Sequence, residues 1–186
     1  MKIGIFGGSF NPPHKMHKKI ALELINKKYI DYLIYVPTGN LYPKKNLISD
    51  KYRFDMLNIM IKKYNNLTVS NYEFDKLTYT YETLRYFKEK YPNDEIYFIC
   101  GSDNLKQINT WKNYQEILNN YKLLVIRRNN DLINNYKDKV IVTDIKEDVL
   151  SSTMIRKNIK ENKIEKITDI IDKEVLNYIL KNNLYL

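Results

Sequence analysis

Cysteine is almost absent from this sequence, because Cys100 is the only one among 186 residues. A single thiol cannot form a disulfide within the chain, and a zinc site built from several cysteines is excluded for the same reason. So low a cysteine content is typical of a protein kept in a reducing compartment. We therefore expect a cytoplasmic protein.

Long apolar runs are also missing. No stretch approaches the roughly 20 apolar residues that a membrane-spanning helix needs, and Met1 and Lys2 lead straight into strand-like sequence rather than into a signal peptide. Glycine and proline are scarce, with five of each, and no segment rich in them divides the chain. These absences predict that the protein has no membrane partner and forms one domain spanning residues 1–186.

Acidic residues are outnumbered, since 22 Asp and Glu face 31 Lys and Arg and leave a formal net charge of +9. Such a charge is compatible with nucleic acid, anionic lipid or a small anionic substrate. The lysines, however, are spread along the whole chain, and no aromatic RNA-binding motif accompanies them. We expect no nucleic-acid partner. A non-catalytic nucleotide- or RNA-binding protein is kept as the alternative from another class.

Strand-like and helical segments alternate along the chain. Runs rich in β-branched and aromatic residues predict strands near residues 3–6, 32–36, 67–69, 95–100, 123–126 and 140–142. Amphipathic segments predict helices that include residues 20–25, 50–62, 81–90 and 173–180. Asp50 is expected to cap the second of these, and Val175, Ile179 and Leu180 to form the buried stripe of the last. The alternation predicts an α/β fold, doubly wound, with a mostly parallel sheet of about five or six strands and ligands at its carboxyl edge.

The first candidate site is the turn after the first strand, from Gly7 to His17. Gly7, Gly8 and Ser9 let the backbone approach a ligand closely, and the amides at the start of the following helix favour an anion. His14 and His17 are the only two histidines in the chain. Because they stand three residues apart on one helical turn, their rings are expected to share a face and to reach the same group.

A second helix start of the same kind lies much later in the sequence. Ser151, Ser152 and Thr153 supply hydroxyls and amides, and Arg156 supplies a guanidinium one turn further on. Two helix starts that converge on one crevice indicate a polyphosphate ligand. The sequence has neither a Walker P-loop nor the third glycine of the dinucleotide-binding pattern. It also lacks the nucleophile elbow and the metal-ligand spacing that would indicate a hydrolase.

The two motifs together carry a resemblance to a known family. The patterns Gly-Gly-Ser-Phe-Asn-Pro-x-His-x-x-His and Ser-Ser-Thr-x-Ile-Arg resemble those of the nucleotidylyltransferase superfamily. More narrowly, the chain is similar to bacterial nicotinate-nucleotide adenylyltransferases rather than to phosphopantetheine adenylyltransferases. The internal matches that favour this branch are residues 37–40 with Lys44, residues 78–80 with 83–84, and residues 101–103 with Trp111. The resemblance covers nearly the whole chain and implies a Rossmann-like nucleotidylyltransferase fold.

The resemblance implies a reaction as well as a fold. In that reaction the 5′-phosphate of nicotinate mononucleotide attacks the α-phosphorus of ATP, which gives deamido-NAD and pyrophosphate in NAD biosynthesis. ATP and nicotinate mononucleotide would be the small-molecule partners, with Mg²⁺ held by the ATP phosphates and not by protein side chains. Nicotinamide mononucleotide or phosphopantetheine remains the alternative acceptor. The oligomeric state stays open, with a homo-oligomer as one option.

The resemblance also implies roles for residues of this chain. The catalytic residues would be His14, His17 and Arg156, with the histidines on the phosphates and Arg156 on the β- and γ-phosphates. The ATP-binding residues would be Gly7, Gly8, Ser9, Phe10, Gly101, Asp103, Ser151, Ser152 and Thr153. The acceptor-binding residues would be Lys44, Thr78, Tyr79, Thr80, Trp111 and Arg127. Among these, Trp111 would face the pyridine ring, and the amides and hydroxyls of residues 78–80 would receive the nicotinate carboxylate.

Many of these assignments have a purely structural alternative. A histidine, serine, threonine or aspartate at a helix end can simply cap the helix, and a lone aromatic residue is more often packed than used for binding. A lysine in a loop or an arginine at a strand end can simply be solvated. The residues concerned are His14, His17, Ser151, Ser152, Thr153, Asp103, Trp111, Tyr79, Lys44 and Arg127.

Met16 departs from the family pattern His-x-Gly-His, in which glycine or another small residue stands directly before the second histidine. A small residue there would let the helix backbone approach the nucleotide. We therefore expect the methionine either to add bulk near the ATP ribose or adenine or, because its side chain is flexible, to fold aside. Its replacement by glycine is expected to leave the fold intact.

Overall fold

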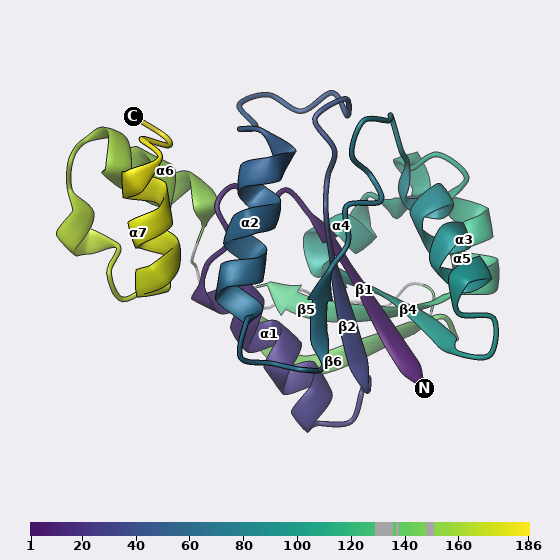
Figure 1. The fold of residues 1–186 in the computed structure, drawn as a ribbon. Coiled ribbons are helices and arrows are strands. Elements are labelled where there is room, and N and C mark those ends of the chain that lie inside the picture. Colours follow the sequence, from purple (N-terminus) through teal and green to yellow (C-terminus); the bar gives the residue numbers. More distant parts are fainter. Residues whose placement is uncertain (129–135, 137, 148–150) are drawn as a thin grey trace.

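The computed structural model describes residues 1–128, 136, 138–147 and 151–186. These residues form a six-stranded sheet with the strand order β3-β2-β1-β4-β5-β6. Every neighbouring pair of strands runs parallel. The predicted α/β fold is therefore confirmed, and all the strands of the sheet in Figure 1 are parallel.

The elements alternate as the sequence predicts. The strands are β1 (Lys2–Gly8), β2 (Tyr32–Pro37), β3 (Leu67–Val69), β4 (Glu95–Gly101), β5 (Lys122–Arg128) and β6 (Val140–Glu147). The α-helices are α1 (Lys15–Asn26), α2 (Asp50–Ile61), α3 (Thr80–Lys90), α4 (Ser102–Lys106), α5 (Tyr114–Asn120), α6 (Ser152–Lys160) and α7 (Lys173–Lys181). Two short 3₁₀ turns, η1 (Ile108–Thr110) and η2 (Ile164–Lys166), complete the described elements.

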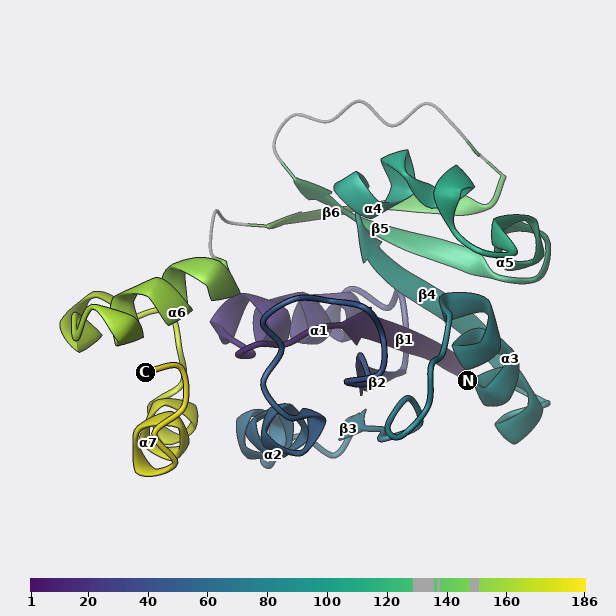
Figure 2. The same ribbon diagram turned by 90° about the horizontal axis from the view of Figure 1, so that it is seen from above.

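Side chains alternate between the two faces of the sheet, as the period of two in a strand requires. In β2, Leu33 and Tyr35 belong to one cluster of buried side chains, and Ile34 and Val36 belong to the other. The first cluster also contains side chains of α1, α2, α6 and α7, and the second contains those of α3, α4 and α5. Figure 2 shows these two groups of helices on opposite sides of the sheet.

Some details of the elements differ from the prediction. Ser49, not Asp50, occupies the cap position of α2, and Asp50 is the first helical residue. In α7, Leu180 is 43% exposed while Leu176 is buried, so the predicted stripe was wrong at that position. Residues 175, 176 and 179 share one helical face, and residue 180 lies at its edge. No helix in the described part of the chain is both long and apolar enough to cross a membrane.

Helices α6 and α7, with η2 between them, stand together beside α1 and α2 (Figures 1 and 2). We call residues 151–186 the α6–α7 unit. The ammonium group of Lys18 in α1 lies 2.6 Å from the carboxylate of Asp172, just before α7. The N–H of Lys15 donates a 3.0 Å hydrogen bond to the carbonyl of Ile170. The unit is thus attached close to the start of α1, where the first motif lies.

Candidate active site

The turn after β1 is shaped by one buried aromatic ring. Phe10 has a backbone φ of 46°, in the left-handed region, and its ring is 3% exposed and packs edge-on against Tyr35 and His17. A Cβ added to Gly8 would lie 3.1 Å from this ring, so the position favours glycine. Phe10 therefore supports the turn, and a contact with a nucleotide at this residue has to come from its backbone.

The two histidines share a face, as predicted. His14 is buried at the cap position of α1, and its ring stacks on that of His17 with 3.8 Å between the ring centroids. The backbone N–H of His14 donates a 3.1 Å hydrogen bond to Nδ1 of His17. An accepting ring nitrogen carries no proton, so in the neutral imidazole the proton sits on Nε2. His17 is thereby held in the tautomer that presents an Nε2–H donor.

The two motifs that the sequence places far apart are in direct contact. Ser152 Oγ donates a 2.9 Å hydrogen bond to the carbonyl of Pro12. Arg156 Nη1 donates a 2.7 Å hydrogen bond to the carbonyl of Asn11. The start of α6 is therefore joined to the turn that leads into α1, as the prediction of one crevice requires.

The start of α6 is also organised by its own side chains. Ser151 caps the helix, because its hydroxyl accepts a 3.2 Å hydrogen bond from the N–H of Met154. The N-cap that the sequence predicts for this segment is therefore confirmed at Ser151. Thr153 Oγ1 accepts a 3.1 Å hydrogen bond from Nη2 of Arg156. The guanidinium group is held on one side by Thr153 and on the other by the backbone of Asn11.

A cavity of about 620 Å³ opens at the carboxyl edge of the sheet. The end of β1, the loops after β2 and β3, the start of α3 and the segment around η1 contribute to its walls. Of the predicted site residues it brings together Gly7, Gly8, Ser9, Lys44, Thr78, Tyr79, Thr80 and Trp111. Its volume lies in the range of small-molecule and cofactor sites, about 300–1,000 Å³.

The remaining predicted site residues do not line this cavity. They are Phe10, His14, His17, Gly101, Asp103, Arg127, Ser151, Ser152, Thr153 and Arg156. Gly101 caps α4 and Asp103 lies in its first turn, whereas Arg127 is exposed in β5. The structure thus divides the predicted residues into a cavity group and a second group around the starts of α1 and α6, and it joins Gly101, Asp103 and Arg127 to neither.

Two buried hydroxyls at the cavity have no hydrogen-bond partner among the described residues. They belong to Ser9 and Thr78. A buried hydroxyl without a partner costs about 1–3 kcal/mol. Such groups mark positions where a ligand can supply the missing hydrogen bond, and here one lies in the first motif and the other before α3.

One group predicted to receive a carboxylate is already engaged. The backbone N–H of Tyr79 donates a 2.8 Å hydrogen bond to Oε2 of Glu82, in the first turn of α3. This N–H is therefore not open to a ligand carboxylate, and the prediction was wrong for the amide of Tyr79. The Thr78 hydroxyl and the first residue of α3, Thr80, still line the cavity.

Trp111 reaches the cavity from the segment after η1. Its half-buried ring lies edge-on to Phe98, with 5.8 Å between the centroids. On the neighbouring wall, Lys112 Nζ lies 4.3 Å from the centroid of the Tyr79 ring. The ring of Trp111 is therefore packed on one side and lines the cavity on another.

Arg53 is a buried residue that reasoning from the sequence missed. The side chain is 0% exposed, and it donates hydrogen bonds to the carbonyls of Ser9 (2.9 Å), Thr38 (2.6 Å) and Ile48 (3.1 Å) and to Oδ1 of Asn40 (2.9 Å). It therefore joins the turn after β1 to the loop after β2. Its sequence signal was its position four residues before Leu57, on the apolar face of α2.

Lys44 lies among other cations at the cavity. Partial burial lowers the pKa of its ammonium group, and the charges of Arg53 and Arg156 lower that pKa further. Three positive groups are thus near enough to influence one another on the side of the cavity next to the α6 start. Such an arrangement favours a multiply charged anion.

Glu73 is a second missed residue on the cavity wall. Its buried carboxylate accepts a 2.6 Å hydrogen bond from the hydroxyl of Thr83 and another from the N–H of Gly39. Burial raises the pKa of Glu73 to about 7, although both hydrogen bonds oppose that rise. A Cβ on Gly39 would lie 1.9 Å from the carbonyl oxygen of Glu73, so only glycine fits there. The loop after β2 and the segment after β3 are therefore in close contact.

Met16 is folded into the core, which is the second of the two arrangements expected for it. Its side chain is 2% exposed and packs in the same cluster as Ile20 and Leu24. It is not among the residues that line the cavity. Because a glycine would leave a void in this cluster and lower the helix propensity of α1, we expect Met16→Gly to lower the free energy of unfolding.

Metal-ligating residues do not cluster in the described ranges. Within residues 1–128, 136, 138–147 and 151–186, no group of three or more His, Cys, Asp or Glu side chains could hold a metal ion. The polar chemistry of the site comes instead from amides, hydroxyls, two imidazoles and several cations. This set of groups fits an anionic ligand.

Comparison with known proteins extends these observations. Residues 5–158 match the model of the cytidylyltransferase-like family. The chain is 37% identical over 198 residues to a probable nicotinate-nucleotide adenylyltransferase of Carboxydothermus hydrogenoformans, covering 99% of this chain and 98% of that protein. It is 36% identical over 199 residues to the protein of the same description from Clostridium tetani, with the same coverage.

Solved structures agree with the sequence comparison. The nicotinic acid mononucleotide adenylyltransferase of Plasmodium falciparum, complexed with NaAD, is similar with a TM-score of 0.85 and 26% identity. The match covers 99% of this chain and 97% of that one. The complex of the same enzyme with APC matches with a TM-score of 0.82. Similarity therefore extends over the sheet, both groups of helices and the α6–α7 unit.

Proposed function

Because the chain belongs to the nicotinate-nucleotide adenylyltransferase family, we propose that its site transfers the adenylyl group of ATP to nicotinate mononucleotide. The products are deamido-NAD and pyrophosphate, in a step of NAD biosynthesis. One observation carries the proposal. The hydrogen bonds from Ser152 to Pro12 and from Arg156 to Asn11 join two anion-binding helix starts beside a cavity of about 620 Å³.

The ATP phosphates are proposed to bind where α1 and α6 begin. Both helix starts offer backbone amides and the positive end of a helix dipole. In this proposal Arg156 contacts the β- and γ-phosphates, and His14 and His17 lie at the phosphates with the Nε2–H of His17 as a donor. As the bond between the α-phosphorus and pyrophosphate breaks, negative charge accumulates on the leaving oxygens. Donors that are already fixed in place stabilise that charge without reorganising.

The acceptor is proposed to occupy the cavity group of residues. Trp111 offers a face to the pyridine ring, Thr78 offers its hydroxyl to the carboxylate, and Lys44 offers a cation to the 5′-phosphate. An oxygen of that phosphate then attacks the α-phosphorus in line as pyrophosphate leaves, and no covalent bond to the protein forms. Catalysis of this kind depends on holding the two phosphates in line. For Gly101 and Asp103 the support is the sequence motif of residues 101–103, and for Arg127 it is the family resemblance alone.

The reaction is proposed to use ATP as its Mg²⁺ complex, in the cytoplasm. The family resemblance supports a metal ion bound by the substrate phosphates. Within the described residues, no group of three or more His, Cys, Asp or Glu side chains is placed to hold one. Mg²⁺ supplies charge neutralisation on the phosphates. The chain itself contributes Arg156, Lys44 and the two helix starts. The free, buried thiol of Cys100 suits a reducing environment.

A panel of acceptors tests the proposal. Purified protein is assayed for pyrophosphate release with ATP, Mg²⁺ and nicotinate mononucleotide, nicotinamide mononucleotide or phosphopantetheine. We expect the highest kcat/KM with nicotinate mononucleotide, because the Thr78 hydroxyl and the start of α3 favour a carboxylate over a neutral amide. Turnover with phosphopantetheine alone would overturn the assignment. Nucleotide binding without turnover of any acceptor would favour the non-catalytic alternative.

A further inference from the structure

Asn11 connects three segments that are far apart in the sequence. Its side chain is 3% exposed. Its Nδ2 donates a 2.7 Å hydrogen bond to the carbonyl of Asn46, in the loop after β2. Its own carbonyl accepts from Arg156 Nη1 in α6, and its Oδ1 accepts a 2.9 Å hydrogen bond from the hydroxyl of Tyr185, after α7. The first motif is therefore tied to both ends of the α6–α7 unit through one residue.

Tyr185 is held in place by its surroundings. Its backbone φ is 68°, in the left-handed region that residues with a side chain rarely adopt. The preceding residue, Leu184, is buried, and its N–H donates a 3.0 Å hydrogen bond to the carbonyl of Ile179. Burial raises the pKa of the Tyr185 phenol, so the group stays neutral and donates a hydrogen bond. The charges of Arg156 and Arg53 act on the same phenol, which shows that it lies close to the cationic side of the site.

The Tyr185 hydroxyl determines how the Asn11 amide is oriented. With Tyr185 donating to Oδ1, the Nδ2 group points to the carbonyl of Asn46. Without that hydroxyl, the donor left to Oδ1 among the described residues is the N–H of Ile48, at 3.5 Å. Both Asn46 and Ile48 belong to the loop that carries Lys44. One hydroxyl therefore secures the loop of Lys44 and the backbone that holds Arg156.

We propose that Tyr185 is a positioning residue for adenylyl transfer, because its hydroxyl fixes Asn11 and Asn11 fixes Arg156 and the loop that carries Lys44. The inference rests on the proposed function and deepens it. The α6–α7 unit then has two roles. It supplies the start of α6, and through Tyr185 it fixes the position of Arg156 relative to the first motif.

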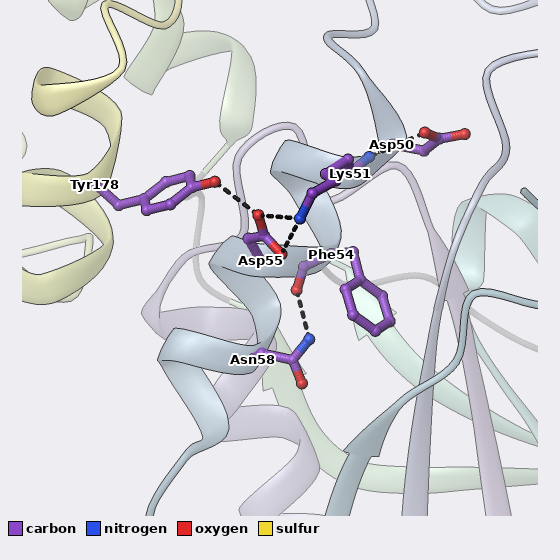
Figure 3. Close-up of polar contacts among 6 residues, drawn as sticks. All are labelled: Asp50, Lys51, Phe54, Asp55, Asn58 and Tyr178. Carbon is purple, nitrogen blue, oxygen red and sulfur yellow. Dashed lines mark hydrogen bonds and ion pairs between the residues drawn. The ribbon is translucent and has the colours of Figure 1, made fainter.

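A second tyrosine of the same unit provides a matched control. The hydroxyl of Tyr178 in α7 donates a 2.8 Å hydrogen bond to Oδ2 of Asp55 in α2. Figure 3 shows this contact together with Lys51, which forms an ion pair with Asp55. None of these three residues lines the cavity or contacts Asn11 through a hydrogen bond that the structure describes. Tyr178 therefore attaches the unit to α2 without reaching the site.

The experiment compares Tyr185→Phe with Tyr178→Phe. Each change removes one hydroxyl that links the α6–α7 unit to another element and leaves the ring in place. We expect kcat/KM for ATP to fall about 5- to 10-fold in Tyr185→Phe, the effect of one lost hydrogen bond. We expect Tyr178→Phe to keep the kinetic constants of the wild type, with both variants showing similar, small decreases in Tm. Equal kinetic constants for the two variants would overturn the inference.

A double-mutant cycle tests the path through Asn11. In an Asn11→Ala background, Tyr185→Phe is expected to cause no further loss of kcat/KM for ATP, because the group that it positions is already absent. Losses that multiply independently would overturn the proposed path. Failure of the proposed function is recognised separately, as an absence of deamido-NAD formation by the wild type. In that case the affinity of the same variants for ATP is measured by calorimetric titration. No further loss of affinity in the double variant supports the path through Asn11, and losses that multiply independently overturn it.

Discussion

At the scale of single residues, the site contains buried polar groups whose burial is energetically unfavourable. The hydroxyls of Ser9 and Thr78 have no hydrogen-bond partner in the described part of the chain. Burial in the cavity wall raises the pKa of the Glu73 carboxyl group. Groups of this kind destabilise the folded protein. Their concentration at one cavity is typical of a binding site that a ligand completes.

The Thr78 hydroxyl is expected to show opposite effects on stability and binding. Thr78→Val removes a buried hydroxyl without a partner and keeps the shape of the side chain, so the free energy of unfolding should stay equal or rise by up to about 1 kcal/mol. KM for nicotinate mononucleotide should rise about 10-fold while KM for ATP stays unchanged. Urea denaturation and steady-state kinetics measure the two effects.

Thr143 supplies the control for this change. Its hydroxyl is buried but donates a 3.1 Å hydrogen bond to the carbonyl of Val125. Thr143→Val should therefore lower the free energy of unfolding by about 1 kcal/mol and leave both KM values alone. A loss of stability in Thr78→Val as large as that in Thr143→Val would contradict the interpretation of Thr78.

His17 is expected to act mainly on turnover. The Nε2–H donor of His17 is oriented before substrate binds, because His14 donates its backbone N–H to Nδ1. His17→Ala should lower kcat by about 100-fold or more if this donor stabilises charge in the transition state. Single-turnover kinetics with ATP and nicotinate mononucleotide measure the effect. Near-normal turnover in a folded variant would show that the assigned role is wrong.

Glu73 is expected to make stability depend on pH. Because burial raises its pKa from 4.5 to about 7, the folded protein holds this proton more tightly than the unfolded chain does. Its contribution to stability is therefore full below pH 4.5 and is lost as the pH rises toward 7 and above. Denaturation of the wild type and of Glu73→Gln between pH 5 and 8 should show a shallower decline in the variant. Parallel curves would refute this account of Glu73.

At the scale of elements, α2 does more than cover one face of the sheet. Its buried face carries Met56 and Leu57 into the core and also carries Arg53 to the carbonyl groups of two ligand-facing loops. A guanidinium group suits this task because its five N–H donors lie in one rigid plane. The helix thus positions the walls of the site without lining it.

Loss of Arg53 is expected to be costly. Arg53→Ala leaves several buried carbonyl groups without donors, so the free energy of unfolding should fall on the order of 3 kcal/mol or more. Arg53→Lys should recover only part of this, since an ammonium group cannot reach both loops in the same plane. Lys51→Ala in the same helix removes an exposed ion pair with Asp55 (Figure 3) and should cost less than about 1 kcal/mol. Similar losses for Arg53→Ala and Lys51→Ala would contradict the proposed role.

At the scale of the whole molecule, the α6–α7 unit shares a core with the sheet. Ile155 of α6 and Val175 of α7 belong to the same buried cluster as Tyr97 and Leu124 of the strands. The ion pair between Lys18 and Asp172 lies at the border between the unit and α1. We propose on this basis that the chain is one folding unit.

A single cooperative transition is the expected outcome. If residues 1–186 unfold together, the calorimetric and van't Hoff enthalpies should agree, and amides of α7 and α1 should exchange hydrogen at the same limiting rate. Differential scanning calorimetry and hydrogen exchange provide these measurements. An earlier, separate transition of the α6–α7 unit would show that two units are present.

Several features could be predicted from the sequence because they depend on local order along the chain. The alternation of apolar strands with amphipathic helices predicts the parallel sheet, and the spacing of His14 and His17 predicts that their rings share one face at a helix start. Both are confirmed. The spacing of residues within one turn or strand is a property of the chain itself, so it needs no knowledge of distant segments.

Only the tertiary structure decided how distant segments meet. Arg53 and Glu73 were not singled out from the sequence, and the sequence left open whether Met16 packs in the core, since burial depends on what packs against a residue. Asn11 belongs to a motif visible in the sequence, yet its contacts with Arg156 and Tyr185 span 145 and 174 positions of the chain. Such contacts arise from the packing of helices against a sheet, and no periodicity in the sequence encodes them.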